Sequence, residues 1–386
     1  MEKNTEKGAY EALLDRLISQ RRQFDQKAEK DSQKRWDSIG KPIDGLGLLE
    51  KMVSRIAGMT GNIDVRADRR AVAVMCADNG VVEEGVTQTG QEITALVAEN
   101  IAEDRSSVCM MARAARADVF AVDLGIAREI SREKMSSICD SVLSAELPPS
   151  GAVTHGKIAG KKIAFGTGNI AVQAAMTREQ AAYAVCRGIE TVKELKNMGY
   201  QIIASGEMGI GNTTTSSAAA CCLTGLTPEQ TTGRGAGLSA EGVLHKTEVV
   251  SQACALHRPD ASDALDVISK VGGYDMAGMT GLFIGGAIFG IPVIIDGVIS
   301  TVSAVLADIL CPGCRDFMLA SHLGKEPAAA PLLERLELVP VIRAELALGE
   351  GTGAVTLLPL LDMALCIYSE NITFEDIHMD SYQRMD

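Results

Sequence analysis

A glycine-rich segment near the middle of the chain has residue types suited to binding a phosphate. Residues 206–215 read Gly-Glu-Met-Gly-Ile-Gly-Asn-Thr-Thr-Thr and lie between an apolar run and an Ala-rich helix that we expect to begin near Ser216. Glycines expose backbone N–H groups, and the unpaired donors at a helix N-terminus favour an anion. The glycine order matches neither a Walker loop nor the dinucleotide fingerprint. A phosphate site is predicted here, and a plain strand-to-helix turn capped by a threonine at 213–215 is the alternative.

A second glycine cluster could extend the same anion site. Residues 232–237 read Thr-Gly-Arg-Gly-Ala-Gly, and Lys246 falls in the helix that should come next. Backbone N–H donors together with the point charge of a lysine can hold a phosphate. The alternative is that Lys246 is an ordinary solvated side chain.

Two carboxylates occupy positions where burial would change their chemistry. Asp296 ends an apolar run, so it needs donors or a ligand to offset desolvation, unless it simply caps the following helix. Glu350 lies between Gly349 and Gly351, where we expect a helix over 342–348 to end. Partial burial would raise its pKa and make it a general base near neutral pH, and an exposed interhelical glutamate is the alternative.

Short apolar runs separated by helical stretches must position these groups. Each run ends in a small or acidic residue followed by a loop that contains glycine, and the runs are 71–76, 119–122, 162–165, 202–204 and 292–295. Such strands predict an α/β fold with a doubly wound, mostly parallel, Rossmann-like sheet. Ligands bind outside the carboxyl ends of such strands, so the loops should meet at one edge.

Helical periodicity at both chain ends predicts a second, smaller helical domain. We expect residues 1–45 and 325–386 to form it, with residues 46–324 as the large α/β domain. The stretch 279–295 has no charge, but Pro292 and several glycines interrupt it. A buried helix followed by a buried strand is therefore favoured over a membrane span.

Composition and charge exclude several classes of protein. A net charge of −13 without a basic tract argues against a nucleic-acid partner. The first residues contain no apolar signal region, so a cytoplasmic location is expected, with the ten cysteines reduced. Cys311 and Cys314 form a lone pair near His322, and without a second pair we predict no metal site.

Taken in order, these motifs resemble those of the nicotinate-nucleotide:dimethylbenzimidazole phosphoribosyltransferase family. The similarity extends from about residue 38 to residue 365. Besides the two glycine clusters and Asp296, the matching segments are Ala77-Asp-Asn-Gly80-Val-Val, Glu92-Ile-Thr94, Ser321-His322 and Leu348-Gly-Glu-Gly-Thr-Gly-Ala354.

The resemblance implies a homodimeric transferase without a metal or redox cofactor. Ribose 5-phosphate would move from nicotinate mononucleotide to the aromatic base that becomes the lower ligand of a cobamide (vitamin B12), with release of nicotinate. Glu350 matches the catalytic base of the family, and Glu207 matches a second active-site carboxylate. The implied substrate-binding residues are Gly206, Gly209, Ile210, Gly211, Asn212, Thr213, Gly233, Gly235, Lys246, Asp296, Ser321, Asp78 and Gln91.

The implied chemistry suits these residues. Nicotinate bonded through its ring nitrogen is a cationic leaving group, so its departure needs no general acid. The incoming base attacks the ribose carbon from the opposite face, and Glu350 would take the proton from its second nitrogen. Glu207 would favour the cationic character of the ribosyl transition state.

Two departures from the family pattern leave the acceptor open. This chain has Asp78-Asn79-Gly80 where the family often has Asp-His-Gly, and residues 85–91 differ from the usual segment. Both lie in the part that approaches the acceptor in the family. The acceptor could be dimethylbenzimidazole, another benzimidazole, a purine or a phenol.

Two other hypotheses compete with this reading. The chain could be a non-catalytic or phenol-specific subunit that pairs with a paralogue as a heterodimer, although it retains both Glu207 and Glu350. A nicotinamide-dependent oxidoreductase would need a dinucleotide fingerprint after its first strand, and that fingerprint is missing.

Overall fold

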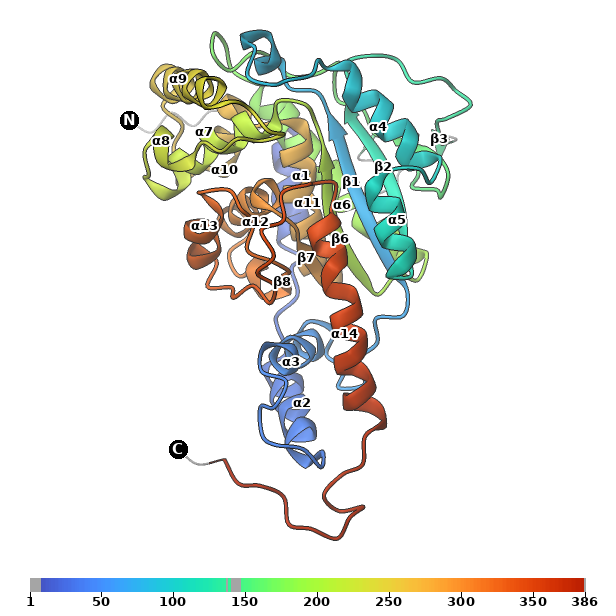
Figure 1. The fold of residues 1–386 in the computed structure, drawn as a ribbon. Coiled ribbons are helices and arrows are strands. Elements are labelled where there is room, and N and C mark those ends of the chain that lie inside the picture. Colours follow the sequence, from blue (N-terminus) through green and yellow to red (C-terminus); the bar gives the residue numbers. More distant parts are fainter. Residues whose placement is uncertain (1–7, 137, 140–146, 385–386) are drawn as a thin grey trace, which may run out of the picture.

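The computed structural model describes residues 8–136, 138–139 and 147–384 and is built around a six-stranded parallel sheet (Figure 1). In spatial order the strands are β5 (Ile158–Gly160), β2 (Ala117–Gly125), β1 (Arg70–Ala77), β6 (Ile202–Met208), β7 (Val293–Ile295) and β8 (Met318–Ala320). Numbered along the chain within this sheet, the order is 3-2-1-4-5-6, which is that of a doubly wound Rossmann-like fold. The predicted fold class is confirmed. A separate two-stranded ladder pairs β3 (Ile138–Cys139) with β4 (Ser150–Gly151).

Helices cover both faces of the sheet. One face is covered by α6 (Arg178–Asn197), α11 (Tyr274–Phe289) and α12 (Val298–Leu310), with α10 (Ala264–Val271) beside them. The other face carries α4 (Glu92–Ala102), α5 (Ser107–Ala114) and α14 (Thr352–Glu370). Three further helices follow the β6 loop near the carboxyl ends of the strands: α7 (Asn212–Thr224), α8 (Pro228–Thr231) and α9 (Ala240–His257).

The uncharged stretch 279–295 lies inside the protein. It comprises most of α11 and the strand β7, so the predicted buried helix and buried strand are confirmed. Glycines allow α11 to approach α6 closely: a Cβ on Gly188 would lie 2.0 Å from the Gly278 carbonyl oxygen. Within the described chain, α14 alone is long and apolar enough to cross a membrane by length and composition, and half of that stretch is buried.

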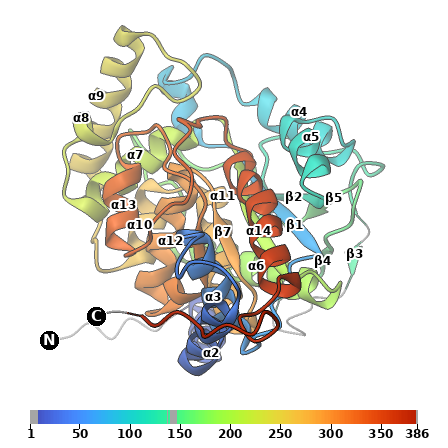
Figure 2. The ribbon, with the colours of Figure 1, turned by 60° about the horizontal axis from the view of Figure 1, so that its bottom comes forward.

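Helices from both ends of the chain meet below the sheet (Figure 2). α2 (Gln26–Ser38) packs on α3 (Leu48–Thr60), and α3 packs on α14. The Trp36 and Tyr368 rings lie 4.8 Å apart between their centroids. By contrast, α1 (Ala9–Ile18) packs on α6, and α13 (Ala329–Arg335) packs on α12. The division into residues 1–45 with 325–386 and 46–324 stays a prediction.

Two predicted elements are wrong. Residues 162–165 form no strand, because the chain leaves the sheet after β5 and continues as a loop whose Phe165 is 56% exposed. Residues 342–348 form no helix, because they run extended beside residues 321–325 and their carbonyl groups accept hydrogen bonds from that segment. The Ile342 carbonyl accepts from the Leu323 N–H at 2.9 Å, and the Leu346 carbonyl accepts from the Lys325 N–H at 3.3 Å.

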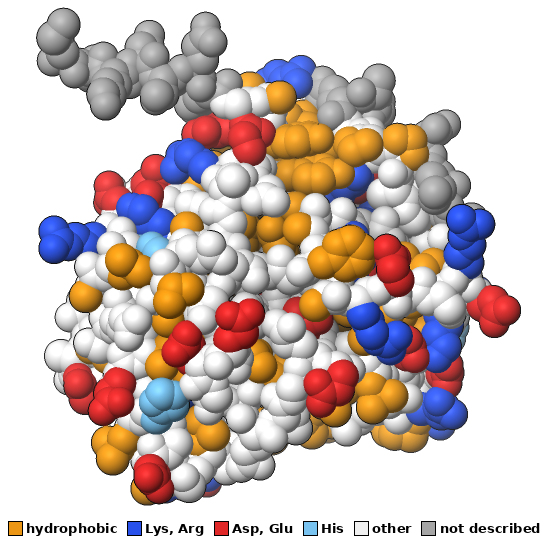
Figure 3. Space-filling model, turned by 90° about the horizontal axis from the view of Figure 1, so that it is seen from above, with side chains coloured by type: hydrophobic (Ala, Val, Ile, Leu, Met, Phe, Trp, Pro, Cys, Tyr) orange, Lys and Arg blue, Asp and Glu red, His pale blue; other side chains and the backbone are white. Residues whose placement is uncertain are grey.

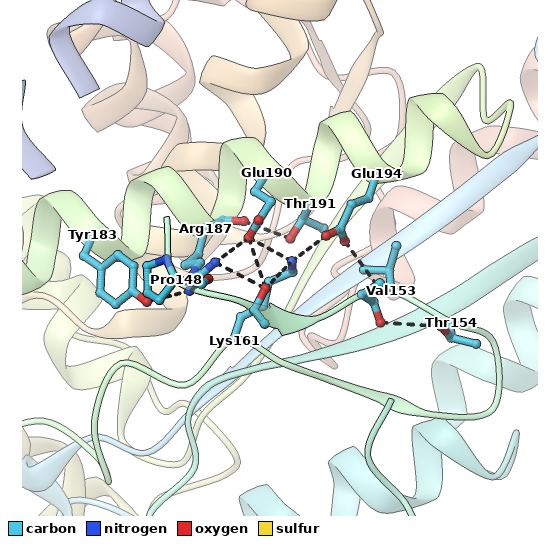
Figure 4. A network of polar contacts seen from close by, with 11 residues as sticks. Pro148, Val153, Thr154, Lys161, Tyr183, Arg187, Glu190, Thr191 and Glu194 are labelled. Atoms are coloured by element: carbon cyan, nitrogen blue, oxygen red, sulfur yellow. Dashed lines mark hydrogen bonds and ion pairs between the residues drawn. The ribbon is translucent and has the colours of Figure 1, made fainter. Parts of the chain in front are cut away.

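A buried charge network links α6 to the described residues before β4 and after β5 (Figure 4). Lys161 directs its Nζ between Glu190 Oε2 and Glu194 Oε1 of α6, at 3.0 and 2.8 Å. Arg187 Nη1 donates to Glu190 Oε2 at 2.8 Å, and its Nη2 donates to the Pro148 carbonyl at 2.9 Å. The network therefore joins α6 to the edge strand β5 and the loop before it.

We expect Lys161→Met to lower the free energy of unfolding by about 3–5 kcal/mol, because two buried carboxylates would lose the ammonium group between them. Denaturant unfolding measures this change. Lys34→Met is the control, since it breaks an exposed ion pair with Asp31 and should cost far less. Equal losses in the two variants would contradict a stabilising role for the network.

Candidate active site

A cavity of about 360 Å³ lies at the carboxyl edge of the sheet, where β1 and β6 meet and the strand order reverses. This is where doubly wound sheets bind ligands. Seen from above (Figure 3), apolar side chains gather in several patches on this face, among backbone and uncharged polar atoms. The predicted site residues that line the cavity are Glu207, Gly209, Ile210, Asn212, Thr213, Gly235, Asp296 and Glu350.

A smaller cavity of about 80 Å³ adjoins the first and shares part of its wall. It is lined by residues 86–89, 209–213 and 234–236, with Leu238 and Lys246, so part of the segment 85–91 lies beside the two glycine clusters. Lys246 Nζ donates to Thr213 Oγ1 at 2.6 Å. A Cβ on Gly235 would lie 2.9 Å from that hydroxyl oxygen, so the glycine lets the loop close over both groups. The two glycine clusters and the lysine therefore meet at one point.

The first glycine loop places the N-terminus of a helix at this smaller cavity. α7 begins at Asn212, four residues earlier than predicted, and its N-cap is Gly211, with φ at +94°, rather than a threonine. Burial lowers the pKa of Lys246 to about 8, while Glu326 nearby acts in the opposite direction. A helix N-terminus beside a desolvated ammonium group is a site for a dianion such as a phosphate.

Glu207 lies between the first glycine loop, residues 209–212, and the turn that carries Glu350. Asn212 Nδ2 donates to Glu207 Oε2, and a Cβ on Gly349 would lie 2.7 Å from Glu207 Oε1. Glu207 is almost completely buried. Burial, and then repulsion from Asp275 and Asp296, raises its pKa to about 8.

Glu350 lies on a tight turn instead of at the end of a helix. Gly349, Glu350 and Gly351 all have left-handed backbone conformations, with φ values of +85°, +60° and +88°. The turn lies against β6, since a Cβ on Gly206 would be 2.6 Å from the Glu350 carbonyl oxygen. Burial raises the pKa of Glu350, whose Oε2 has no hydrogen-bond partner. A half-buried carboxylate held in this way suits a general base.

Asp296 accepts hydrogen bonds from the first turn of the helix that follows Glu350, α14. Its Oδ2 accepts from the Gly351 N–H at 3.2 Å, and its Oδ1 accepts from the Ala354 N–H at 2.9 Å. It therefore caps α14, which is distant in sequence, and not the helix that directly follows it. Ser321, in contrast, is fully buried and donates to the Ile295 carbonyl at 2.6 Å. Its neighbour His322 lines the cavity.

The remaining predicted residues lie behind the cavity wall or beside it. Asp78 accepts from the Ala127 N–H at 2.7 Å, and Gln91 Nε2 donates to the Asn79 carbonyl at 3.1 Å. Both side chains thus hold the loop after β1. Gly233 lines a separate cavity beside residues 325–327.

Sequence reasoning missed Asp275 and the apolar lining of the cavity. Asp275 is fully buried in the first turn of α11 and accepts from Asn212 Nδ2 at 3.1 Å. An acidic residue directly before a long uncharged run was the available signal. The apolar lining includes Ile93, Val97, Leu346 and Leu348, which come from two segments far apart in the sequence.

The chain matches a family model described as phosphoribosyltransferase over residues 22–378. It is 38% identical, over 96% of its length and 99% of the relative, to nicotinate-nucleotide–dimethylbenzimidazole phosphoribosyltransferase of Clostridium acetobutylicum. It is 39% identical to the protein of that name from Acetivibrio thermocellus, over 91% of this chain and 93% of the relative. The chain belongs to the nicotinate-nucleotide–dimethylbenzimidazole phosphoribosyltransferase family.

Solved structures of this family agree with the fold. The crystal structure of CobT from Thermus thermophilus superimposes with a TM-score of 0.82 at 34% identity, covering 92% of this chain and all of the other. The chain is therefore a pentosyltransferase of this family, as its motifs predicted.

Proposed function

We propose that this enzyme transfers ribose 5-phosphate from nicotinate mononucleotide to a benzimidazole-type base, releasing nicotinate and forming the α-riboside 5′-phosphate for cobamide synthesis. The observation that carries the proposal is the pair of joined cavities: a phosphate pocket with Lys246 at one end, and Glu350 among apolar side chains at the other. Glu207 lies between the loops that form the two ends.

The donor is held through its phosphate. The N-terminus of α7 and Lys246 bind the dianion, and this places the ribose towards Glu207. When the bond to nicotinate breaks, positive charge develops on the ribose carbon and its ring oxygen. An ionised Glu207 stabilises that charge in a buried, weakly screened site.

The acceptor lies against the apolar part of the cavity. Ile93, Val97 and the leucines at 346 and 348 suit a fused benzene ring better than the polar edge of a purine. One nitrogen of the base attacks the ribose carbon, and Glu350 takes the proton from the other. With a phenol, the same carboxylate would instead remove the hydroxyl proton.

We expect the dependence of kcat/KM for nicotinate mononucleotide on pH to be bell-shaped and narrow, with its maximum near pH 8. Glu207, with a pKa raised to about 8, must lose its proton, so activity falls as pH decreases. Lys246, with a pKa lowered to about 8, must keep its proton, so activity also falls as pH increases. The bound donor phosphate raises the pKa of Lys246. At saturating donor, the decrease of kcat at high pH should therefore be smaller than the decrease of kcat/KM. A profile flat from pH 6 to 9 would contradict both assignments.

Product analysis tests the function itself. The purified chain is incubated with nicotinate mononucleotide and, separately, with benzimidazoles, adenine and phenols, and the products are separated and identified by mass spectrometry. Nicotinate release that depends on a benzimidazole supports the proposal. No release with any acceptor would instead favour a non-catalytic subunit of a heterodimer. The homodimer and the cytoplasmic location stay predictions.

A further inference from the structure

One amide side chain, that of Asn212, contacts Glu207 and links it to a second buried acid, Asp275. Asn212 is the first residue of α7, and its side-chain nitrogen Nδ2 donates both to Glu207 Oε2 and to Asp275 Oδ2. Asp275 comes from the first turn of α11 and has no exposed surface. Three separate elements, β6, α7 and α11, thus bring two acids together around one amide group.

The backbone fixes the Asp275 carboxyl group on both sides. Its Oδ1 accepts from the Met276 N–H at 2.9 Å. A Cβ on Gly273 would lie 2.3 Å from Oδ1, and one on Gly209 would lie 2.6 Å from Oδ2. The carboxyl group therefore has no room to move unless α11 or the first glycine loop moves with it.

The amide of Asn212 transmits that fixed position to Glu207. A primary amide nitrogen carries two hydrogens, and Asn212 uses one on each carboxyl group. The orientation of the amide, and with it the position of Glu207 Oε2, is set by where Asp275 lies. A hydrogen bond from an amide also favours the ionised form of each acid.

We propose that Asp275 is a positioning residue for Glu207, which it fixes through the Asn212 amide and whose ionisation it controls by its own charge. The proposal rests on the proposed function in one respect, that the Glu207 carboxylate acts beside the ribose carbon. It adds a residue that never reaches the substrate cavity yet sets when Glu207 is charged.

Charges around the pair agree with this role. Burial raises the pKa of Asp275 to about 6, and Asp78 at the end of β1 contributes in the same direction. Glu207 loses its proton later because burial and then the Asp275 and Asp296 carboxylates raise its pKa to about 8. Cys76 of β1 also faces the two acids, and His322 faces Asp296. Between these two values, burial and the ionised Asp275 together favour the protonated form of Glu207.

Titration of the ligand-free protein tests the proposal independently of turnover. Protein labelled with carboxyl-¹³C glutamate is followed by NMR from pH 5 to 9, with Glu207→Gln identifying the Glu207 signal. In Asp275→Asn the Glu207 midpoint should fall by about one pH unit or more, because the neighbouring negative charge is gone. Asn212→Ala should shift the midpoint the other way, because the ionised form loses a donor.

Asp123→Asn is the matched control. Asp123 is also fully buried with a pKa raised by burial, but it accepts from the Ile126 N–H at 2.9 Å and pairs with Lys162. It should leave the Glu207 midpoint unchanged. If Asp275→Asn leaves the Glu207 midpoint unchanged, as this control should, the proposal is wrong. It is also wrong if neither Asp275→Asn nor Asn212→Ala shifts that midpoint.

Kinetics then link the titration to the reaction. In Asp275→Asn the acid limb of the kcat/KM profile should move to lower pH together with the NMR midpoint. Loss of rate with the limb in its original place would show a merely structural role. If the parent transfers ribose to no acceptor while the NMR shifts occur as expected, the proposed function fails and the control of Glu207 by Asp275 stands.

Discussion

Replacing Glu350 with glutamine should lower kcat for transfer to a benzimidazole by about 10²–10⁴-fold, while KM for nicotinate mononucleotide changes little. Glutamine keeps the shape of the side chain but cannot accept a proton from the attacking base. Glu350 lies on the turn at 349–351, away from the phosphate pocket around Lys246, so donor binding should survive. Steady-state rates of nicotinate release, measured at saturating acceptor, report both parameters.

Glu345→Gln provides a control on the same segment. Glu345 also has a left-handed backbone, with φ at +52°, but its side chain is exposed and does not line the cavity. It should retain the parent rate. Unchanged kcat in Glu350→Gln under chemistry-limited conditions would reject the base assignment, and a large rise in donor KM with unchanged kcat would place Glu350 in donor binding.

Replacing Lys246 with methionine should weaken kcat/KM for nicotinate mononucleotide by about 10–150-fold, equivalent to about 1.5–3 kcal/mol for a lost hydrogen bond to a charged group. The apo protein should not lose stability. Burial already disfavours the ammonium group, as its lowered pKa of about 8 indicates, and methionine fills a similar volume. Kinetics at limiting donor and thermal unfolding of the apo protein measure the two effects.

Lys270→Met serves as the comparison for Lys246→Met. Lys270 pairs with Asp266 on the surface of α10, so its loss should change neither kcat/KM nor the pH profile. The Lys246 variant should also lose the alkaline limb of its kcat/KM profile. Parent-like donor affinity in Lys246→Met would remove this residue from the phosphate site.

Four of the six sheet strands, β1, β2, β6 and β7, could be predicted because each contains a continuous apolar run that is followed by a glycine loop, whereas the short strands β5 and β8 were not predicted. The strand predicted at 162–165 failed because its apolar residues lie in a loop at the sheet edge, where Phe165 is exposed. The helix predicted at 342–348 failed because that segment pairs sideways with residues 321–325. The second error arises from a partner distant in sequence, which periodicity does not reveal.

In the candidate site, too, features set by local sequence could be predicted and those that depend on distant partners could not. The loop that leads into α7 could be predicted because local spacing places backbone donors before a helix, and phosphate binding there stays a prediction. The role of Asp296 could not, since the N–H groups it caps belong to residues 351 and 354. Asp275 was missed for a related reason, because only the folded chain places it beside Asn212 and Glu207.

The left-handed backbone at Glu350 makes the stability of the protein and its activity favour different residues at this position. A non-glycine residue in this region costs roughly 1–2 kcal/mol relative to glycine. Since φ at Glu350 is +60° and both neighbours are glycines, glycine would fit position 350 with less strain than the glutamate does. Selection for thermostability alone would therefore favour losing the carboxylate, and laboratory evolution of a more robust enzyme must screen for turnover at every round.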